Sequence, residues 1–283
     1  MVSVVTSDGA HSLFIVGHGI KVHSSFELAA GIFVEPTVPG FEMQDAADGS
    51  AHFTDYSAVI TGRDLADFSL RIESEQSGQA LAVKGWNALW NFHLLSLAAQ
   101  SPVCSIFSMT PGTRPIFAAA NRNVLMRRFA DAKTIGADRL AWARDNKKAF
   151  DALIKAPPFS AAMRCYGNSH YLFDADMRIM LLWSGIEGLL SVDTELTRRI
   201  ALYAALMIEG SHEDKVKWFA EVKKAYRVRS KAVHGGIANE QIFQDGYNQA
   251  SRILVRLLVR CVEIGRVPTP AELDALAISS TLS

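Results

Sequence analysis

From residue 134 onward the sequence repeats one pattern, an amphipathic helical segment followed by a short connection, and this pattern limits the folds open to the chain. A segment at 135–155 runs without proline until Pro157 and Pro158, which stop a helix. Residues 170–191 carry an apolar stripe at helical spacing, made of Ile179, Leu182, Trp183, Ile186, Leu189 and Leu190. Short connections favour antiparallel neighbours, so we predict an antiparallel helical bundle over residues 134–283.

Capping residues mark the boundaries of the later helices. The helix after 191 is expected to end at Gly210, and Ser211 is a suitable N-cap for the next one. A long helix is expected around 240–265. The tetrapeptide from Thr269 to Glu272 has the spacing of a capping box with proline at the first helical position. A short helix should therefore close the chain.

The first part of the chain, residues 1–130, has a different pattern. Short apolar or alternating runs bounded by Gly, Pro, Asp or Asn are typical of strands, and they occur at 12–20, 26–36, 56–61, 103–110 and 114–121. Residues 79–99 are long, lack proline and carry an apolar face, which favours a helix. We predict an α+β N-terminal region followed by a mainly α antiparallel bundle.

Overall composition excludes some classes of function. The 29 basic and 29 acidic residues cancel, so the chain as a whole is not a basic coat for nucleic acid. The most apolar run is short and contains Glu187, so we expect no membrane association. The three cysteines, Cys104, Cys165 and Cys261, form no CxxC pair and are expected to be buried thiols in a reducing compartment. With a poor signal-peptide pattern at the N-terminus, we predict a cytoplasmic protein.

Positive charge is concentrated in one segment of this neutral chain. Residues 215–234 contain seven lysines and arginines and only one acid, Glu221. The segment ends in "YRVRSKAVHGG", which places Arg229 and His234 just before a glycine pair. Most charge runs on helices are solvated faces, so the charge alone leaves a structural role and a binding role open.

Helical geometry separates Arg229 from His234. Five residues correspond to about 140° on an ideal helix, so the two side chains flank an apolar face that we expect Phe219, Tyr226, Ser230 and Val233 to form. To act on one phosphate, the helix must break between them, or the partner groups must come from a second chain. The Gly235–Gly236 pair permits a break just after His234. The plainer alternative is that His234 caps the helix end and Arg229 pairs with Glu187 on a neighbouring helix.

Three segments in order resemble the HEPN superfamily, and most closely its Apea-like branch. They are "LLWSGIEGLL" (181–190), "ELTRRIALYAALMIEG" (195–210) and "AYRVRSKAVHGG" (225–236), and the resemblance covers about residues 160–265. It implies a bundle of four or five helices that forms a homodimer. It also implies a metal-independent endoribonuclease without a cofactor, in which Arg229 and His234 from two chains meet at the dimer interface and the setting is defence or stress.

The resemblance implies roles for the surrounding residues. His234 would be the acid/base and Arg229 the phosphate clamp, with Glu187, Ser230 and Tyr226 in support. RNA would bind the cations Lys223, Lys224, Arg227 and Lys231. Ser230 departs from the Asn, Asp or His that ribonucleolytic members often carry directly after the arginine. Some family members only mediate binding or assembly, so a non-catalytic HEPN interaction module is the alternative function.

Other residues leave further alternatives open. Arg252, Arg256 and Arg260 recur every four residues on the long helix, where they could line an RNA groove or form ion pairs within the bundle. A third type of function, small-ligand binding, would need a closed pocket lined by Trp183 and Tyr203. The remaining histidines have no HxH or HExxH spacing, so we expect no metal site.

Overall fold

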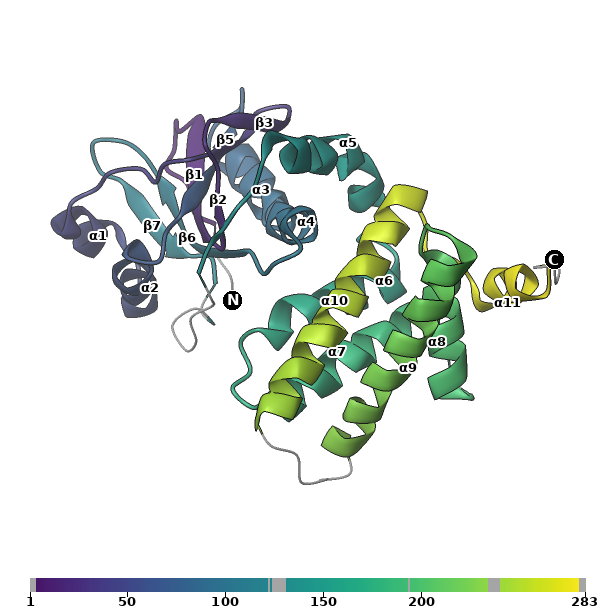
Figure 1. The fold of residues 1–283 in the computed structure, drawn as a ribbon. Helices are drawn as coiled ribbons and strands as arrows, with labels where there is room; N and C mark the ends of the chain where they lie inside the picture. Colours follow the sequence, from purple (N-terminus) through teal and green to yellow (C-terminus); the bar gives the residue numbers. More distant parts are fainter. Residues whose placement is uncertain (1–3, 122, 124–130, 193, 234–239, 280–283) are drawn as a thin grey trace. The chain divides into compact units, whose positions relative to one another are not determined.

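The computed structural model describes residues 4–121, 123, 131–192, 194–233 and 240–279. These residues form two compact units, 1–147 and 148–283, each with its own internal contacts. The boundary lies within the helix α5 (Ala137–Leu153). The first unit contains a β-sheet with helices, and the second is mainly helical (Figure 1). The α+β character of the first part and the helical character of the second are thus confirmed.

The first unit is built on a six-stranded sheet. Its strands are β1 (Ser12–His18), β3 (Phe26–Ala29), β4 (Ile32–Glu35), β5 (Phe68–Glu73), β6 (Cys104–Thr110) and β7 (Ile116–Ala119). They lie in the order β3-β4-β5-β1-β6-β7, and every neighbouring pair is antiparallel. Two short strands, β2 (Ile20–Lys21) and β8 (Lys133–Thr134), form a separate parallel pair.

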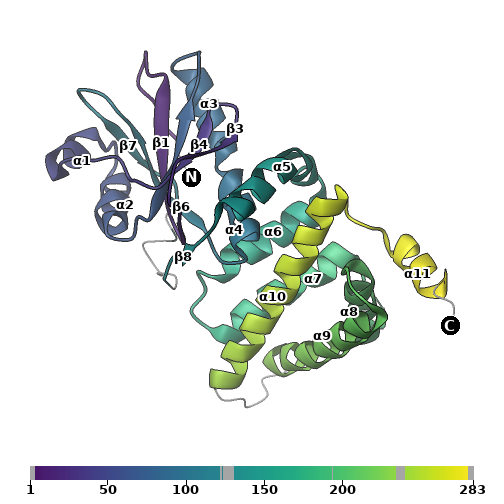
Figure 2. The same ribbon diagram turned by 45° about the horizontal axis from the view of Figure 1, so that its top comes forward.

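Helices cover both faces of this sheet (Figure 2). On one face, α1 (Met43–Gly49) and α2 (Phe53–Arg63) pack on β6 and β7. On the other, α3 (Gln79–Ala88) and α4 (Trp90–Ala99) pack on β1, β5 and β6. The aromatic rings of Phe92 on α4 and Phe68 on β5 lie 5.7 Å apart across this second layer. The central strands are therefore buried on both sides.

One element prediction for this unit was wrong, and another was correct in type but not in continuity. Residues 56–61 were expected to form a strand but belong to α2, because Ala58, Val59 and Gly62 bury one helical face against the sheet. A Cβ at Gly62 would lie 2.2 Å from Ile106, so only glycine permits this approach. The predicted helix at 79–99 is two helices, since the backbone bonding tightens around Leu89, whose N–H donates to Trp86 O three residues back.

The second unit is a bundle of amphipathic helices. After α5 come α6 (Pro157–Ser169), α7 (Ala175–Leu190), α8 (Leu196–Met207), α9 (His212–Val233), α10 (Glu240–Ile264) and α11 (Pro270–Ser279). The predicted caps are present: Ser211 and Asp214 cap α9 reciprocally, as do Thr269 and Glu272 for α11. The helix α6 was not predicted, although the proline pair that stops α5 also begins it.

The helix α7 lies at the centre of the bundle and packs against α6, α9 and α10. Its predicted stripe is fully buried, including Trp183 and Ile186. Two glycines allow close helix contacts. A Cβ at Gly185 would lie 2.9 Å from Cys165 on α6, and a Cβ at Gly246 on α10 would lie 2.6 Å from Val228 on α9. No helix in the described part of the chain combines the length and apolarity that a membrane span needs.

Candidate functional site

The buried face of α9 orients the residues around Arg229. Trp218, Val222, Ala225 and Tyr226 are buried, whereas Phe219 and Ser230 are only half-buried. The predicted apolar face was therefore correct at Tyr226 but misplaced at Phe219. The Tyr226 ring packs edge-on against Trp183 of α7, with centroids 5.0 Å apart. This contact fixes the rotation of α9 and directs Arg229 toward α7.

Glu187 on α7 joins Tyr226 and Arg229. Its Oε1 accepts a hydrogen bond of 3.2 Å from the Tyr226 hydroxyl and lies 3.3 Å from Nη2 of Arg229. The Arg229 guanidinium also lies 5.4 Å from the centroid of the Tyr226 ring. The side chains of Arg229 and Glu187 keep 25% and 20% of their exposure. Arg229 is thus anchored at the edge of the bundle rather than buried in it.

Tyr226 is a hydrogen-bond donor in this cluster over a wide pH range. Burial raises the pKa of its hydroxyl, the negative charge and hydrogen bond of Glu187 raise it further, and the positive charge of Arg229 opposes them. The protonated hydroxyl therefore supports the Glu187 carboxylate at neutral pH. The sequence suggested Glu187 as a partner of Arg229, but nothing in the spacing indicated that Tyr226 shares the same carboxylate oxygen.

Arg229 uses only part of its hydrogen-bonding capacity within the described residues. Its ion pair with Glu187 involves one nitrogen, Nη2, and its other contact is with the face of the Tyr226 ring. A guanidinium carries five N–H donors in a planar fork. The remaining donors of Arg229 can therefore bind a second anion while Glu187 holds the group in place.

The four predicted RNA-binding cations, Lys223, Lys224, Arg227 and Lys231, are all exposed on α9. None of them forms an ion pair with another described residue. Lys223 contacts the ring of Phe219 from 5.9 Å. The outer face of α9 is therefore a surface of positive charge beside Arg229, and we call these four residues the α9 cation face.

The arginines of α10 mostly pair within the bundle. Arg252 lies 2.7 Å from Glu221, and Arg260 contacts Glu209 and Glu263. Arg256 stacks over Trp218, with its guanidinium 4.6 Å from the ring centroid. Of the two readings left open by the sequence, ion pairing within the bundle accounts for Arg252 and Arg260.

The outcomes for the remaining predicted site residues differ. Ser230 is half-buried and makes no side-chain hydrogen bond with another described residue. His234 lies outside the described residues, which stop at Val233 and resume at Glu240. Trp183 and Tyr203, expected to line a ligand pocket under the third alternative, are fully buried core side chains, and the Tyr203 hydroxyl donates to Asp274 at 2.6 Å.

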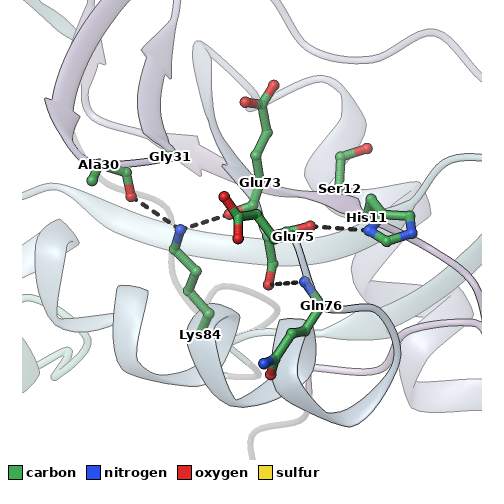
Figure 3. Close-up of a pocket in the computed structure, with 9 residues that line it drawn as sticks. His11, Ser12, Ala30, Gly31, Glu73, Glu75, Gln76 and Lys84 are labelled. Atoms are coloured by element: carbon green, nitrogen blue, oxygen red, sulfur yellow. Dashed lines mark hydrogen bonds between the residues drawn. The ribbon is translucent and has the colours of Figure 1, made fainter.

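An open pocket of about 750 Å³ lies on the first unit and was not anticipated from the sequence. It is lined by His11, Ser12, the β3–β4 turn, the end of β5 and Lys84 (Figure 3). The Lys84 ammonium donates to the carbonyls of Ala30, at 3.0 Å, and Glu73, at 2.6 Å. Lys84 therefore links the turn, the strand and α3. These residues come from four separate segments between His11 and Lys84, so no local motif could reveal them.

Comparisons with protein-family models, curated proteins and solved structures found no match for this chain. In the part of the chain that the structure describes, no group of three or more His, Cys, Asp or Glu side chains is placed to hold a metal ion.

Proposed function

We propose that this protein is a metal-independent endoribonuclease of the HEPN type, which cleaves RNA by attack of the 2′-hydroxyl on the adjacent phosphate. Arg229 is the phosphate clamp and His234 the acid/base. Glu187, Tyr226 and Ser230 support them, and RNA lies along the α9 cation face. The resemblance supplies the biological setting: a cytoplasmic homodimer that acts in defence or stress, with the first unit as sensor or regulator.

One observation carries the proposal. Arg229 is held by Glu187 through a single nitrogen at 3.3 Å, beside four exposed cations that have no ion-pair partner among the described residues. The Arg229 side chain keeps 25% of its exposure, so its remaining N–H donors face solvent and are open to an anionic ligand. An anchored, partly exposed guanidinium next to a cationic surface is suited to a phosphodiester.

The chemistry requires only groups that the chain supplies. A neutral imidazole of His234 takes the proton of the RNA 2′-hydroxyl, and the oxygen attacks the neighbouring phosphorus. Negative charge grows on the non-bridging oxygens, where Arg229 stabilises it. The bond to the 5′-oxygen then breaks, and an imidazolium protonates that oxygen. The products are a 2′,3′-cyclic phosphate and a 5′-hydroxyl.

The homodimer is part of the proposal because of helical geometry. Arg229 and His234 are separated by about 140° if the helix continues, so one chain does not easily bring both groups to one phosphate. Two chains that share an interface at this end of α9 would supply Arg229 from one protomer and His234 from its partner. The proposed site is then composite.

A second candidate is a non-catalytic HEPN interaction module. The observation that favours it is the same Tyr226–Glu187–Arg229 cluster. An ion pair that is reinforced by a tyrosine has a sufficient role in joining α7 to α9, without any catalytic role. Under this alternative Arg229 stabilises the bundle, and the wild-type protein does not cleave RNA.

An RNA cleavage assay in EDTA separates the two candidates. Wild type should cleave RNA with EDTA present, and Arg229→Ala and His234→Ala should each reduce the rate by about 100-fold or more. Arg252→Ala is the matched control, because Arg252 also pairs with a glutamate on a neighbouring helix. The proposal fails if EDTA abolishes cleavage or if His234→Ala cleaves as fast as wild type.

A further inference from the structure

A carboxylate, an imidazole and a thiol form a row across the central strands of the first unit. Asp67 directly precedes β5, His18 ends β1, and Cys104 begins β6. The strands β5, β1 and β6 are consecutive in the sheet. The residues are 49 and 86 positions apart along the chain, so only the strand register brings them together.

Asp67 fixes the orientation of the His18 ring. Its Oδ2 lies 2.6 Å from Nδ1 of His18 and also accepts the backbone N–H of Gly19 at 3.0 Å. Because a carboxylate only accepts, Nδ1 carries the proton, and Nε2 is the nitrogen that can take another. Both side chains are nearly buried. The imidazole is therefore held in one tautomer and one orientation.

Cys104 is the direct cross-strand neighbour of His18. The register of β1 and β6 pairs His18 with Cys104, one step after a bulge between Val16 and Gly17. Directly opposed residues of an antiparallel pair point to the same face of the sheet, with Cβ atoms about 5 Å apart. The thiol and the imidazole thus share one face, in the order acid, imidazole, thiol.

We propose that Cys104 is a peroxide-reactive thiol, activated by His18 and Asp67 and oxidised by hydrogen peroxide to a sulfenic acid. The row resembles the acid–base–nucleophile order that activates thiols in general. Cys104 keeps only 6% of its exposure, which favours hydrogen peroxide, a small oxidant with two oxygen atoms, over bulky organic peroxides. The site lies in the first unit and is independent of the proposed ribonuclease function.

In this oxidation His18 carries the proton, and the electrons pass from sulfur to the peroxide. His18 takes the proton of the Cys104 thiol, and Asp67 stabilises the imidazolium that forms. The thiolate sulfur attacks one peroxide oxygen, and the O–O bond breaks. The departing hydroxide takes the proton from His18 and leaves as water. Sulfur loses two electrons, the peroxide gains them, and the imidazole returns to its neutral form.

The two other cysteines serve as controls within the same molecule. Burial raises the pKa of the Cys165 thiol, which Arg164 partly opposes, and burial raises the pKa of Cys261 to about 12. Cys165 is nevertheless more exposed than Cys104. If exposure alone governs oxidation, Cys165 reacts first, whereas activation by His18 makes Cys104 first.

The test treats the full chain with hydrogen peroxide, stops the reaction at intervals with catalase, unfolds the chain in denaturant that contains dimedone to trap sulfenic acid, and measures each cysteine by peptide mass spectrometry. We expect Cys104 to react at least about tenfold faster than Cys165, and His18→Gln or Asp67→Asn to remove this advantage while the Cys165 rate stays the same. The wild-type comparison needs no variant, so it stands even if a variant unfolds, which a rise in the Cys261 rate would reveal. Equal rates at Cys104 and Cys165, or a Cys104 rate unchanged by both substitutions, overturn the proposal.

Discussion

Glu187 and Arg229 form an ion pair through one guanidinium nitrogen at 3.3 Å, and the same carboxylate oxygen accepts a hydrogen bond from Tyr226. This arrangement ties a charged side chain of α9 to the central helix of the bundle. It leaves part of the guanidinium available at the surface.

Glu187→Gln should lower the pKa of Tyr226. The substitution removes the negative charge that helps to raise this pKa, while burial keeps it above the ordinary value for tyrosine. The measurement is a pH titration of tyrosine ring signals by NMR, with Tyr226→Phe to assign the signal. Glu221→Gln is the control, since Glu221 pairs with Arg252. An unchanged Tyr226 titration in Glu187→Gln would contradict the geometry.

Stability should fall at alkaline pH because of buried tyrosines. Burial is the main reason why the pKa of Tyr166 is raised above its ordinary value of about 10. The folded state therefore holds this proton more tightly than the unfolded chain. The contribution of this proton to the free energy of unfolding is complete below pH 10. As pH rises further this contribution is lost, at up to about 1.4 kcal/mol per pH unit.

Urea denaturation between pH 8 and pH 11.5, followed by circular dichroism, measures this slope. Tyr166→Phe cannot ionise at this position, so its stability should decline less steeply with pH than that of wild type. Identical slopes for the two proteins would show that Tyr166 does not contribute.

The α9 cation face should set the salt dependence of RNA binding. Each of its four cations that contacts a phosphate contributes about 0.7 to the slope of log affinity against log salt for a single strand. Lys223→Ala and Arg227→Ala should each lower that slope, as measured by fluorescence anisotropy over a salt series. Arg252→Ala, whose guanidinium already pairs with Glu221, should leave it nearly unchanged. Equal effects of all three variants would exclude this surface as the binding site.

Lys84→Met should destabilise the first unit. The substitution keeps most of the apolar stem but removes two hydrogen bonds from a charged donor to the carbonyls of Ala30 and Glu73. Hydrogen bonds of this kind contribute about 1.5–3 kcal/mol each at most. We expect faster hydrogen exchange in the β3–β4 hairpin, with the helices of the second unit unaffected. Lys21→Met, which replaces an exposed lysine, is the control.

Gly246→Ala should destabilise the contact between α9 and α10. The added methyl would lie 2.6 Å from Val228, and such overpacking costs about 1–3 kcal/mol. The double substitution Gly246→Ala with Val228→Ala removes the valine methyl that the added carbon would clash with, and should restore part of the loss in thermal unfolding. If Gly246→Ala is as stable as wild type, the helices do not approach as closely as described.

Sequence patterns predicted the second unit better than the first. Its helices are long enough to show their apolar stripes, and caps such as Ser211 and Thr269 mark where they begin. The strand β5 at Phe68–Glu73 was not predicted, and α2 was expected to be a strand, because short segments take their structure from neighbours far along the chain. Packing against β6 and β7 makes 53–63 a helix, and no local signal reports that packing.

Some contacts of the candidate sites could also be predicted from the sequence, and others could not. A pairing of Arg229 with Glu187 could be anticipated because both lie in recognisable helices. The shared oxygen with Tyr226, the carbonyl ligands of Lys84 and the row of Asp67, His18 and Cys104 could not. Each depends on register or on side-chain direction between segments that are remote in sequence.

Gly246 places a constraint on the site that chemistry alone would not reveal. It allows α10 to press against Val228, the residue directly before Arg229. A side chain at position 246 would clash with Val228, and we expect the clash to push α9 and the Arg229 guanidinium away from their present positions. A residue with no functional group is therefore expected to be as intolerant of change as the charged residues it helps to place. A survey of variants should find position 246 restricted to glycine wherever Arg229 and Glu187 are retained.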